Sequence, residues 1–239
     1  MLYKGIMVKF KYYRFWILCT AVLVFLCFSH NALAVNLVVE VKSTSGKPVS
    51  QAVVYASPIS STNTPAGETA PYTLDQKNKE FIPFISVVRT GTAVYFPNSD
   101  QIQHHVYSFS RAKKFDIPLY EGMPPNPVVF EKEGVVPLGC NIHDWMLAYV
   151  YVVETPYFAK TDKDGSAFIE LIHGPGEYDV RVWHPELRGS AKSTNQRIRV
   201  ETGEDIPFQI NAEFVIKMKK LLRVRRGPTS SGFGKGGYR

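Results

Sequence analysis

Residues 139–146 read Gly-Cys-Asn-Ile-His-Asp-Trp-Met and place a thiolate, an imidazole and a thioether within seven residues. The ligand set of a mononuclear electron-transfer copper site is two His and one Cys in a trigonal plane, with a weak axial Met. Cys140, His143 and Met146 supply three of these four ligands. Read alone, the same spacing also fits a buried Cys, a surface His and a core Met, so the fourth ligand decides between the two interpretations.

The missing His is expected on a strand far away in the sequence. The segment at 103–107, Gln-His-His-Val-Tyr, offers two candidates, His104 and His105. Together with the loop at 139–146, this pair predicts a site for one type 1 copper ion.

The first 34 residues have the features of a secretory signal peptide. A basic region with Lys4, Lys9, Lys11 and Arg14 precedes an apolar run at 15–28, and Ala-Leu-Ala at 32–34 matches a small-x-small cleavage signal. The run is shorter than the about 20 apolar residues that a membrane-spanning helix needs, which disfavours an uncleaved anchor. We therefore expect an exported protein whose mature chain begins at Val35.

Removal of this leader changes the cysteine count and the charge. Cys19 and Cys27 leave with it, so Cys140 would be the single cysteine and no intrachain disulfide could form. A lone Cys in an exported protein is a free thiol, an intermolecular partner or a metal ligand, and an exposed thiol is a liability in an oxidising compartment. This favours the metal interpretation.

The mature chain would carry 24 basic against 21 acidic side chains, a net charge of +3. The basic character of the whole chain therefore comes largely from the leader. Nucleic-acid binding has no support in this charge or in the expected compartment.

Short apolar segments separated by turn residues predict an all-β chain. Before Val153 no segment has a sustained helical period, and the pattern is typical of an antiparallel β-sandwich with the ligand loop at one end, between the last two strands. The strands expected there lie at 35–41, 49–56, 81–88, 92–96, 104–109, 113–120, 128–130, 135–139 and 147–153.

Two segments follow the ligand loop. A smaller β unit is expected at 155–212, where Asp162, Asp164 and Gly165 form a hairpin turn, since they lack the further oxygen ligands of a calcium loop. His173 and His184 are expected in a turn and on the surface. The stretch at 213–239 is predicted to be a basic disordered tail, either solvated, which we favour, or in contact with an anionic membrane surface or an acidic partner.

The motif Gly91-Thr92-x-Val94-x-Phe96-x-Asn98-x-Asp100-x3-His104-x-Val106, followed by Gly134-x4-Gly139-Cys140-x2-His143-x2-Met146, resembles the plastocyanin/amicyanin group of cupredoxins. The loop spacing is the short, amicyanin-like version, and the stretch at 81–153 is also similar to exported methylamine-utilisation-type cupredoxin proteins. The resemblance implies a cupredoxin Greek-key β-sandwich and a periplasmic location.

The sequence departs from this group directly after the upstream ligand, where Asn is frequent and His105 stands here. Spacing from Asn98 and Asp100 favours His104 as the ligand. Strand alternation instead favours His105, which shares a face with Tyr107. His104 is preferred, with His105 as the alternative.

The segments at 161–180 and 46–54 resemble a carboxypeptidase regulatory-like β-sandwich. Either the cupredoxin is inserted into this module, or the first strands belong to the cupredoxin and the second unit is appended. The expected parts are a signal peptide at 1–34, N-terminal strands and a linker at 35–70, a cupredoxin domain at 71–154, the second β domain at 155–212 (with 35–58 in the inserted arrangement) and the tail at 213–239.

These features predict an electron carrier rather than an enzyme. Its expected partners are exported redox proteins such as a c-type cytochrome or a dehydrogenase. The alternatives are a copper chaperone or storage protein, for which the mature chain has few Met residues, and a non-redox scaffold with a cupredoxin fold. A copper oxidase or reductase would need further His clusters, which the five His residues after the leader do not provide.

Overall fold

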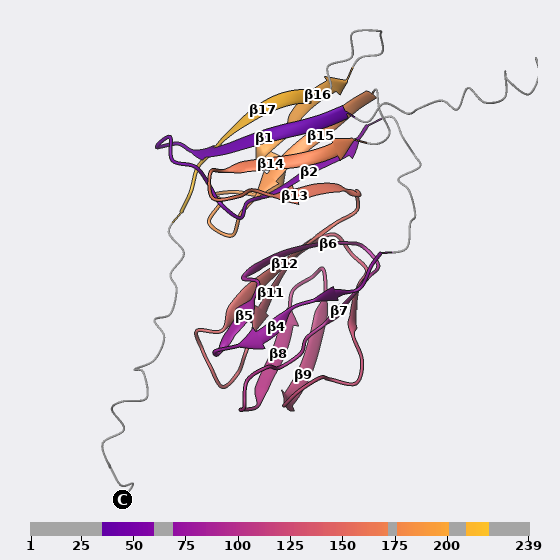
Figure 1. Ribbon diagram of the computed structural model, residues 1–239, viewed down its shortest axis with the longest axis vertical. Coiled ribbons are helices and arrows are strands. Elements are labelled where there is room, and N and C mark those ends of the chain that lie inside the picture. Colours follow the sequence, from indigo (N-terminus) through magenta and orange to yellow (C-terminus); the bar gives the residue numbers. More distant parts are fainter. Residues whose placement is uncertain (1–34, 60–68, 172–175, 201–208, 220–239) are drawn as a thin grey trace, which may run out of the picture. The chain divides into compact units, whose positions relative to one another are not determined.

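The computed structural model describes residues 35–59, 69–171, 176–200 and 209–219 (Figure 1). The predicted signal peptide, His173, most of the linker and the tail beyond Lys219 lie outside these residues. Strands dominate the described part, and the prediction of an all-β fold is confirmed. No helix within it has the length and hydropathy needed to cross a bilayer.

A β-sandwich forms from residues 72–153. Its larger sheet has the strand order β6 (Ile85–Arg89), β12 (Leu147–Val153), β11 (Gly134–Gly139), β8 (His104–Phe109) and β9 (Lys114–Tyr120). Its smaller sheet has the order β10 (Val128–Phe130), β7 (Thr92–Tyr95) and β3 (Tyr72–Thr73). A two-stranded hairpin, β4 (Asp75–Lys77) and β5 (Glu80–Ile82), completes this part of the chain.

Alternation along the strands builds one core for this sandwich. On β12, Ala148, Val150 and Val152 are buried with Val136 and Leu138 of β11. Since successive side chains of a strand point to opposite faces, the same pattern fixes which face of each strand can reach the ligand loop. The core also contains Cys140 and Met146, so both ends of the loop are anchored in apolar packing.

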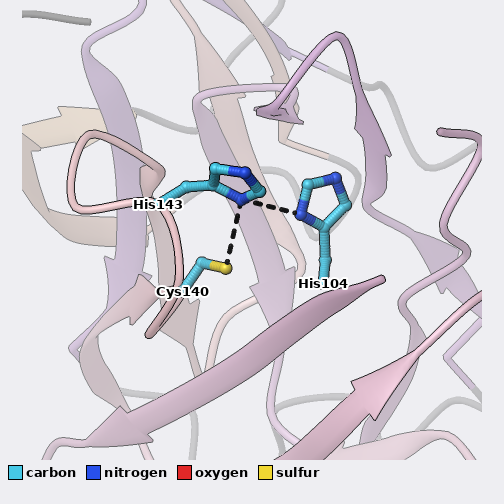
Figure 2. A group of neighbouring side chains, drawn as sticks. All are labelled: His104, Cys140 and His143. Carbon is cyan, nitrogen blue, oxygen red and sulfur yellow. Dashed lines mark hydrogen bonds between the residues drawn. The ribbon is translucent and has the colours of Figure 1, made fainter. Parts of the chain in front are cut away.

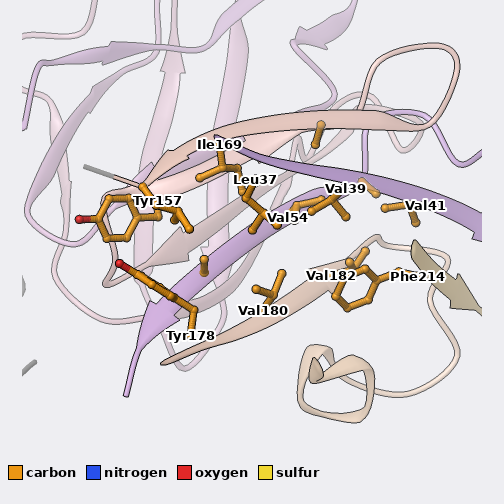
Figure 3. Packing of buried hydrophobic residues seen from close by; sticks show 14 of the residues in the cluster. Leu37, Val39, Val41, Val54, Tyr157, Ile169, Tyr178, Val180, Val182 and Phe214 are labelled. Atoms are coloured by element: carbon orange, nitrogen blue, oxygen red, sulfur yellow. The ribbon is translucent and has the colours of Figure 1, made fainter. Parts of the chain in front are cut away.

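A second β-sandwich contains the first and the last described strands. One sheet has the order β14 (Ser166–Leu171), β1 (Val35–Ser43) and β17 (Gln209–Ile216). The other has the order β13 (Tyr157–Lys160), β2 (Val53–Pro58), β15 (Gly176–Trp183) and β16 (Gln196–Val200), with a short 3-10 helix, η1 (Ala191–Thr194), before β16. Figure 3 shows the core between them, where Leu37, Val39 and Val41 of β1 face Val54, Val180 and Val182.

The strand pairing decides between the two arrangements that the sequence left open. β1 pairs antiparallel with β14 and parallel with β17, and β2 lies between β13 and β15. Thr161 ties the same segments together, since its buried Oγ1 donates to the Val49 carbonyl (2.6 Å) and accepts from the Ala52 N–H (2.8 Å). The first strands therefore pair with the C-terminal strands, and the sandwich of residues 72–153 is inserted between them.

A further apolar cluster includes residues of both strand sets. Tyr55 of β2 and Tyr151 of β12 are joined through their hydroxyls (3.1 Å), and the Tyr151 ring stacks on Trp183 with centroids 4.8 Å apart. These contacts use the face of β12 opposite to the one that carries Ala148 and Val150.

Several sequence expectations were wrong in detail. Three strand pairs are parallel, namely β6 with β12, β3 with β7 and β1 with β17, so the sheets are mixed rather than antiparallel. Long connections separate each of these pairs along the chain, as parallel pairing requires. Residues 213–216, predicted as the start of a disordered tail, belong to β17, because β1 offers them an edge to pair with.

Candidate metal centre

Three predicted ligands converge in the structure. One donor atom from each of His104, Cys140 and His143 lies within 4.8 Å of the other two (Figure 2). Nδ1 of His104 is 3.1 Å from Nδ1 of His143, and Cys140 Sγ is 3.8 Å from Nδ1 of His143. Among the described residues, this is the single group of three or more His, Cys, Asp or Glu side chains close enough to share a metal ion.

The loop between β11 and β12 delivers Cys140 and His143 together. Cys140 follows the last residue of β11 and is 4% exposed. The loop then turns on itself, with the Met146 N–H donating to the His143 carbonyl at 2.9 Å, before β12 begins. Burial of both loop ends in the core leaves the middle, including His143, at the surface.

Met146 ends the loop in the position that the sequence assigned to the axial ligand. It is 2% exposed and packs in the same core cluster as Cys140. A buried thioether directly after the loop matches the donor that completes a type 1 copper ligand set.

His104 and His105 point to opposite faces of β8. His104 is fully buried and reaches the cluster, whereas His105 contacts the Asp116 carboxylate of β9 and lies beside the Tyr107 ring (centroids 5.4 Å apart). The alternation argument was correct that His105 shares a face with Tyr107, but this is the face turned away from Cys140 and His143. The structure therefore brings His104, and not His105, to the candidate centre.

The other residues weighed from the sequence lie elsewhere. His184 Nδ1 accepts a hydrogen bond from the Glu186 N–H, in a turn after β15. Asp162 Oδ1 accepts from the N–H groups of Asp164 and Ser166, which makes this segment a hydrogen-bonded turn. Neither belongs to the candidate metal centre.

The electrostatics of the centre favour the neutral form of His143. Burial lowers the pKa of His143, and the positive charges that His104 and Lys79 can carry lower it further, against an opposing effect of Asp100. A neutral imidazole is the species that coordinates a metal.

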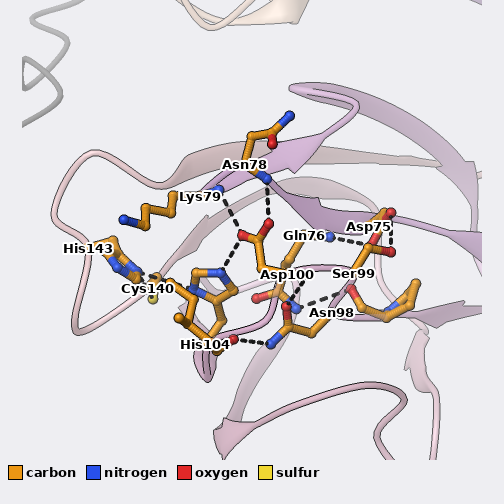
Figure 4. A network of polar contacts seen from close by, with 12 residues as sticks. Asp75, Gln76, Asn78, Lys79, Asn98, Ser99, Asp100, His104, Cys140 and His143 are labelled. Atoms are coloured by element: carbon orange, nitrogen blue, oxygen red, sulfur yellow. Dashed lines mark hydrogen bonds and ion pairs between the residues drawn. The ribbon is translucent and has the colours of Figure 1, made fainter. Parts of the chain in front are cut away.

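A polar network that the sequence did not predict lies next to His104 (Figure 4). Nε2 of His104 is 2.8 Å from Oδ2 of Asp100, a side chain that is 14% exposed. Asn98 supports the same loop by donating to the carbonyls of Ile102 and Tyr120, each at 2.8 Å. The motif contained Asn98 and Asp100, but their partners come from the β4–β5 hairpin and from β9, which sequence spacing does not reveal.

The donor set fits a type 1 copper ion. Two imidazole nitrogens and one cysteine sulfur meet from two separate segments, and a buried thioether lies at the end of the loop. Soft sulfur with imidazole suits copper, whereas magnesium and calcium prefer oxygen donors. Both His104 and Cys140 are removed from water.

Comparison with protein family models and with curated proteins finds no match. Among solved structures, the chain is similar to a copper-containing nitrite reductase from Thermus scotoductus SA-01, with 23% identity and a TM-score of 0.34 over 41% of this chain and 25% of the reductase. It is also similar to a purple cupredoxin from Nitrosopumilus maritimus, with 23% identity and a TM-score of 0.31 over 34% of this chain and 99% of that protein.

An amicyanin variant in its Cu(I) state has 16% identity and a TM-score of 0.32, over 35% of this chain and 82% of amicyanin. The chain spans about a quarter of the length of the nitrite reductase. Because all these identities and TM-scores are low, the chemistry of the site follows from the described residues alone.

Proposed function

We propose that this protein is a periplasmic cupredoxin-like electron carrier that holds one copper ion and passes single electrons between exported redox proteins. The observation that carries the proposal is the convergence of His104 Nδ1, His143 Nδ1 and Cys140 Sγ at one end of a β-sandwich. His104, Cys140 and His143 would hold the ion, and Met146 would be the axial ligand. When bound, copper would accept and release one electron at a time.

The protein's own residues prepare such a site. His104 is fully buried and Cys140 is almost so, which excludes water from the side of the core. The loop is pinned at both ends by apolar packing and within by the bond from Met146 N–H to the His143 carbonyl, so its ligands are held in place. A site that changes little between two oxidation states keeps the reorganisation on electron transfer small.

His143 is the ligand nearest to solvent. It is partly exposed, and its ring lies 5.2 Å from that of Trp145, while the neighbouring Ile142 is 49% exposed. A redox partner that docks here would come close to the metal without any need for the buried ligands to move.

The burial of the ligands weighs against the main alternative. A chaperone or store exchanges its metal with other proteins and needs ligands that these can reach. Here Cys140 is 4% exposed and His104 is fully buried.

The compartment and the partners are proposals drawn from the sequence. The leader at 1–34 supports export, and a protein exported to the periplasm would meet c-type cytochromes and dehydrogenases there.

Voltammetry of the copper-loaded mature protein tests the redox function. We expect one reversible one-electron wave, with one copper ion per chain by metal analysis. In Cys140→Ser the wave should be absent while the far-UV spectrum of a β protein remains. Bound copper without a reversible wave would contradict electron transfer and favour the scaffold interpretation.

A further inference from the structure

We propose that Asp100 is a positioning residue of the metal centre, which holds His104 in one tautomer and one orientation so that the ligand set is assembled before any metal binds. This inference rests on the proposed function, since it concerns the same ligands. It assigns a role to a carboxylate that is not itself a ligand and to the turn that holds it.

The hydrogen-bonding chemistry of the pair fixes the tautomer. An ionised carboxylate only accepts hydrogen bonds, so the proton between Asp100 Oδ2 and His104 Nε2, 2.8 Å apart, belongs to the imidazole. In a neutral imidazole with its proton on Nε2, Nδ1 has a free lone pair. Nδ1 is the atom of His104 that faces His143 and the thiol, so the Asp100 contact leaves the correct atom free for metal.

The contact between Asp100 and His104 also determines which nitrogen of His143 carries a proton. The two Nδ1 atoms are 3.1 Å apart, and a hydrogen bond between them needs one proton. Because Asp100 makes His104 Nδ1 the acceptor, this proton lies on His143 Nδ1. A metal ion held at this atom would require His143 to carry its proton on Nε2 instead, so binding would change the tautomer of His143 with no net proton release from this neutral ring.

Asp100 is itself held firmly. The N–H of Asn78 donates to Oδ1 at 2.6 Å and the N–H of Lys79 donates to Oδ2 at 2.8 Å. Both carboxylate oxygens therefore accept from backbone N–H groups, as the tautomer argument requires.

The turn that supplies these N–H groups touches both histidine-bearing segments. Asn78 and Lys79 link β4 to β5 with φ of 56° and 58°, a left-handed conformation that is uncommon for Lys. The Lys79 N–H donates to Asp100, and the Lys79 carbonyl accepts a hydrogen bond from Trp145 Nε1 at 3.2 Å. The Trp145 ring lies beside that of His143. Figure 4 shows this turn above the ligands, with dashed lines from the backbone nitrogens of Asn78 and Lys79 to the Asp100 carboxylate. Strained turns of this kind persist only where their surroundings hold them.

The chain offers a matched control one residue further along β8. His105 also contacts a carboxylate, that of Asp116, but on the outer face of the sheet and with Asp116 64% exposed. Asp100→Asn and Asp116→Asn are thus the same chemical change at two neighbouring His–Asp pairs, of which only the first includes a candidate ligand. In Asp100→Asn the new amide NH2 can point at a backbone N–H donor, which removes a hydrogen bond. It can instead donate to His104 Nε2, and the imidazole proton would then move to Nδ1.

The first test is the tautomer of His104 in the mature, metal-free wild-type protein, read from long-range ¹H–¹⁵N NMR correlations of the imidazole. We expect a proton on Nε2 and none on Nδ1. A majority of the Nδ1–H tautomer, or a mixture of comparable populations, would overturn the inference. This measurement needs no variant and stays decisive if Asp100→Asn does not fold.

The second test is the affinity for Zn²⁺, measured by competition with a chromophoric chelator. Loss of an outer partner of a metal-bound His lowers affinity about 10–100-fold, and we expect a loss in this range for Asp100→Asn, with Asp116→Asn within about twofold of wild type. The population of Nδ1–H His104 should rise in Asp100→Asn alone. Equal affinities and an unchanged tautomer in Asp100→Asn would contradict the positioning role.

The two proposals can fail separately. If the wild-type protein takes up copper without a reversible wave, the proposed electron transfer fails, while the tautomer and the Zn²⁺ affinities still decide the role of Asp100. If the wave is present and Asp100→Asn keeps wild-type affinity and tautomer, the positioning role fails and the electron carrier stands.

Discussion

His104 and His105 are adjacent on β8, yet their side chains point to opposite faces of the sheet. His104 contacts His143, and His105 contacts Asp116. This difference gives a direct prediction for metal binding. His104→Ala should lower copper affinity by more than the about 10–100-fold associated with outer partners, because it removes a ligand. His105→Ala should leave the affinity close to wild type, as measured by chelator competition. A larger loss in His105→Ala than in His104→Ala would contradict the ligand assignment.

Gly139 precedes Cys140 and lies under the ring of Tyr107 on β8. A Cβ at this position would be 2.8 Å from Cζ and from the hydroxyl oxygen of Tyr107. We expect Gly139→Ala to lower the free energy of unfolding by about 1–3 kcal/mol, the usual cost of overpacking. In a Tyr107→Ala background the same change should cost much less, and denaturant unfolding of the four proteins gives this coupling. Additive effects would show that the ring does not restrict position 139.

Thr161 links the N-terminal strands to the C-terminal sandwich through its buried Oγ1. Thr161→Val keeps the shape but removes both hydrogen bonds, and it leaves the Ala52 N–H without its acceptor. We expect a loss of roughly 1–3 kcal/mol in unfolding free energy, the cost of an unsatisfied buried group. The exposed Thr73→Val is the control and should change stability little. Equal effects in the two variants would argue against the observed pairing of the first strands.

Lys160 gives a prediction for pH. Burial lowers the pKa of its ammonium below the ordinary value of 10.5, so the unfolded chain binds more protons than the folded chain between the two values. The unfolding free energy should therefore rise with pH in this window, and the cost of burying the charge is fully present below it. The variant Lys160→Met lacks the titrating ammonium and should therefore lack this contribution to the pH dependence.

The measurement is denaturant unfolding of both proteins at several pH values up to 10.5. The difference between wild type and Lys160→Met isolates this group, because other titrating side chains contribute to both. Wild type should gain stability relative to the variant as the pH rises. Parallel pH profiles of the two proteins would mean that the pKa of Lys160 is not lowered in the folded state. The ammonium also donates to the Ile85 carbonyl at 2.8 Å, which sets a constant offset between the two curves.

The sequence predicted the elements whose signal is local. The alternation at 104–109 and 147–153 matches β8 and β12, and the spacing of Cys140, His143 and Met146 identified the loop because all three lie on one continuous segment. The sequence also narrowed the upstream ligand to His104 or His105, because neighbouring residues of a strand point to its two opposite faces.

What the sequence did not predict depends on contacts between distant segments. β4 and β5 are three residues each, too short for a periodic signal, and their turn is Asn-Lys rather than a glycine-containing pair. The bond between Asp100 and the N–H groups of Asn78 and Lys79 appears only once the hairpin folds over the loop at 97–103. The parallel pair of β1 with β17 joins residues more than 170 positions apart, beyond any local pattern.

The visible absorption spectrum of the mature protein with Cu(II), beside Cys140→Ser, tests the central claim most directly. We expect an intense thiolate-to-copper band at roughly 600 nm in the wild type, bleached by a mild reductant and absent in the variant. A folded wild-type protein without this band, or a band that persists in Cys140→Ser, would contradict the claim that Cys140 binds copper in a redox site.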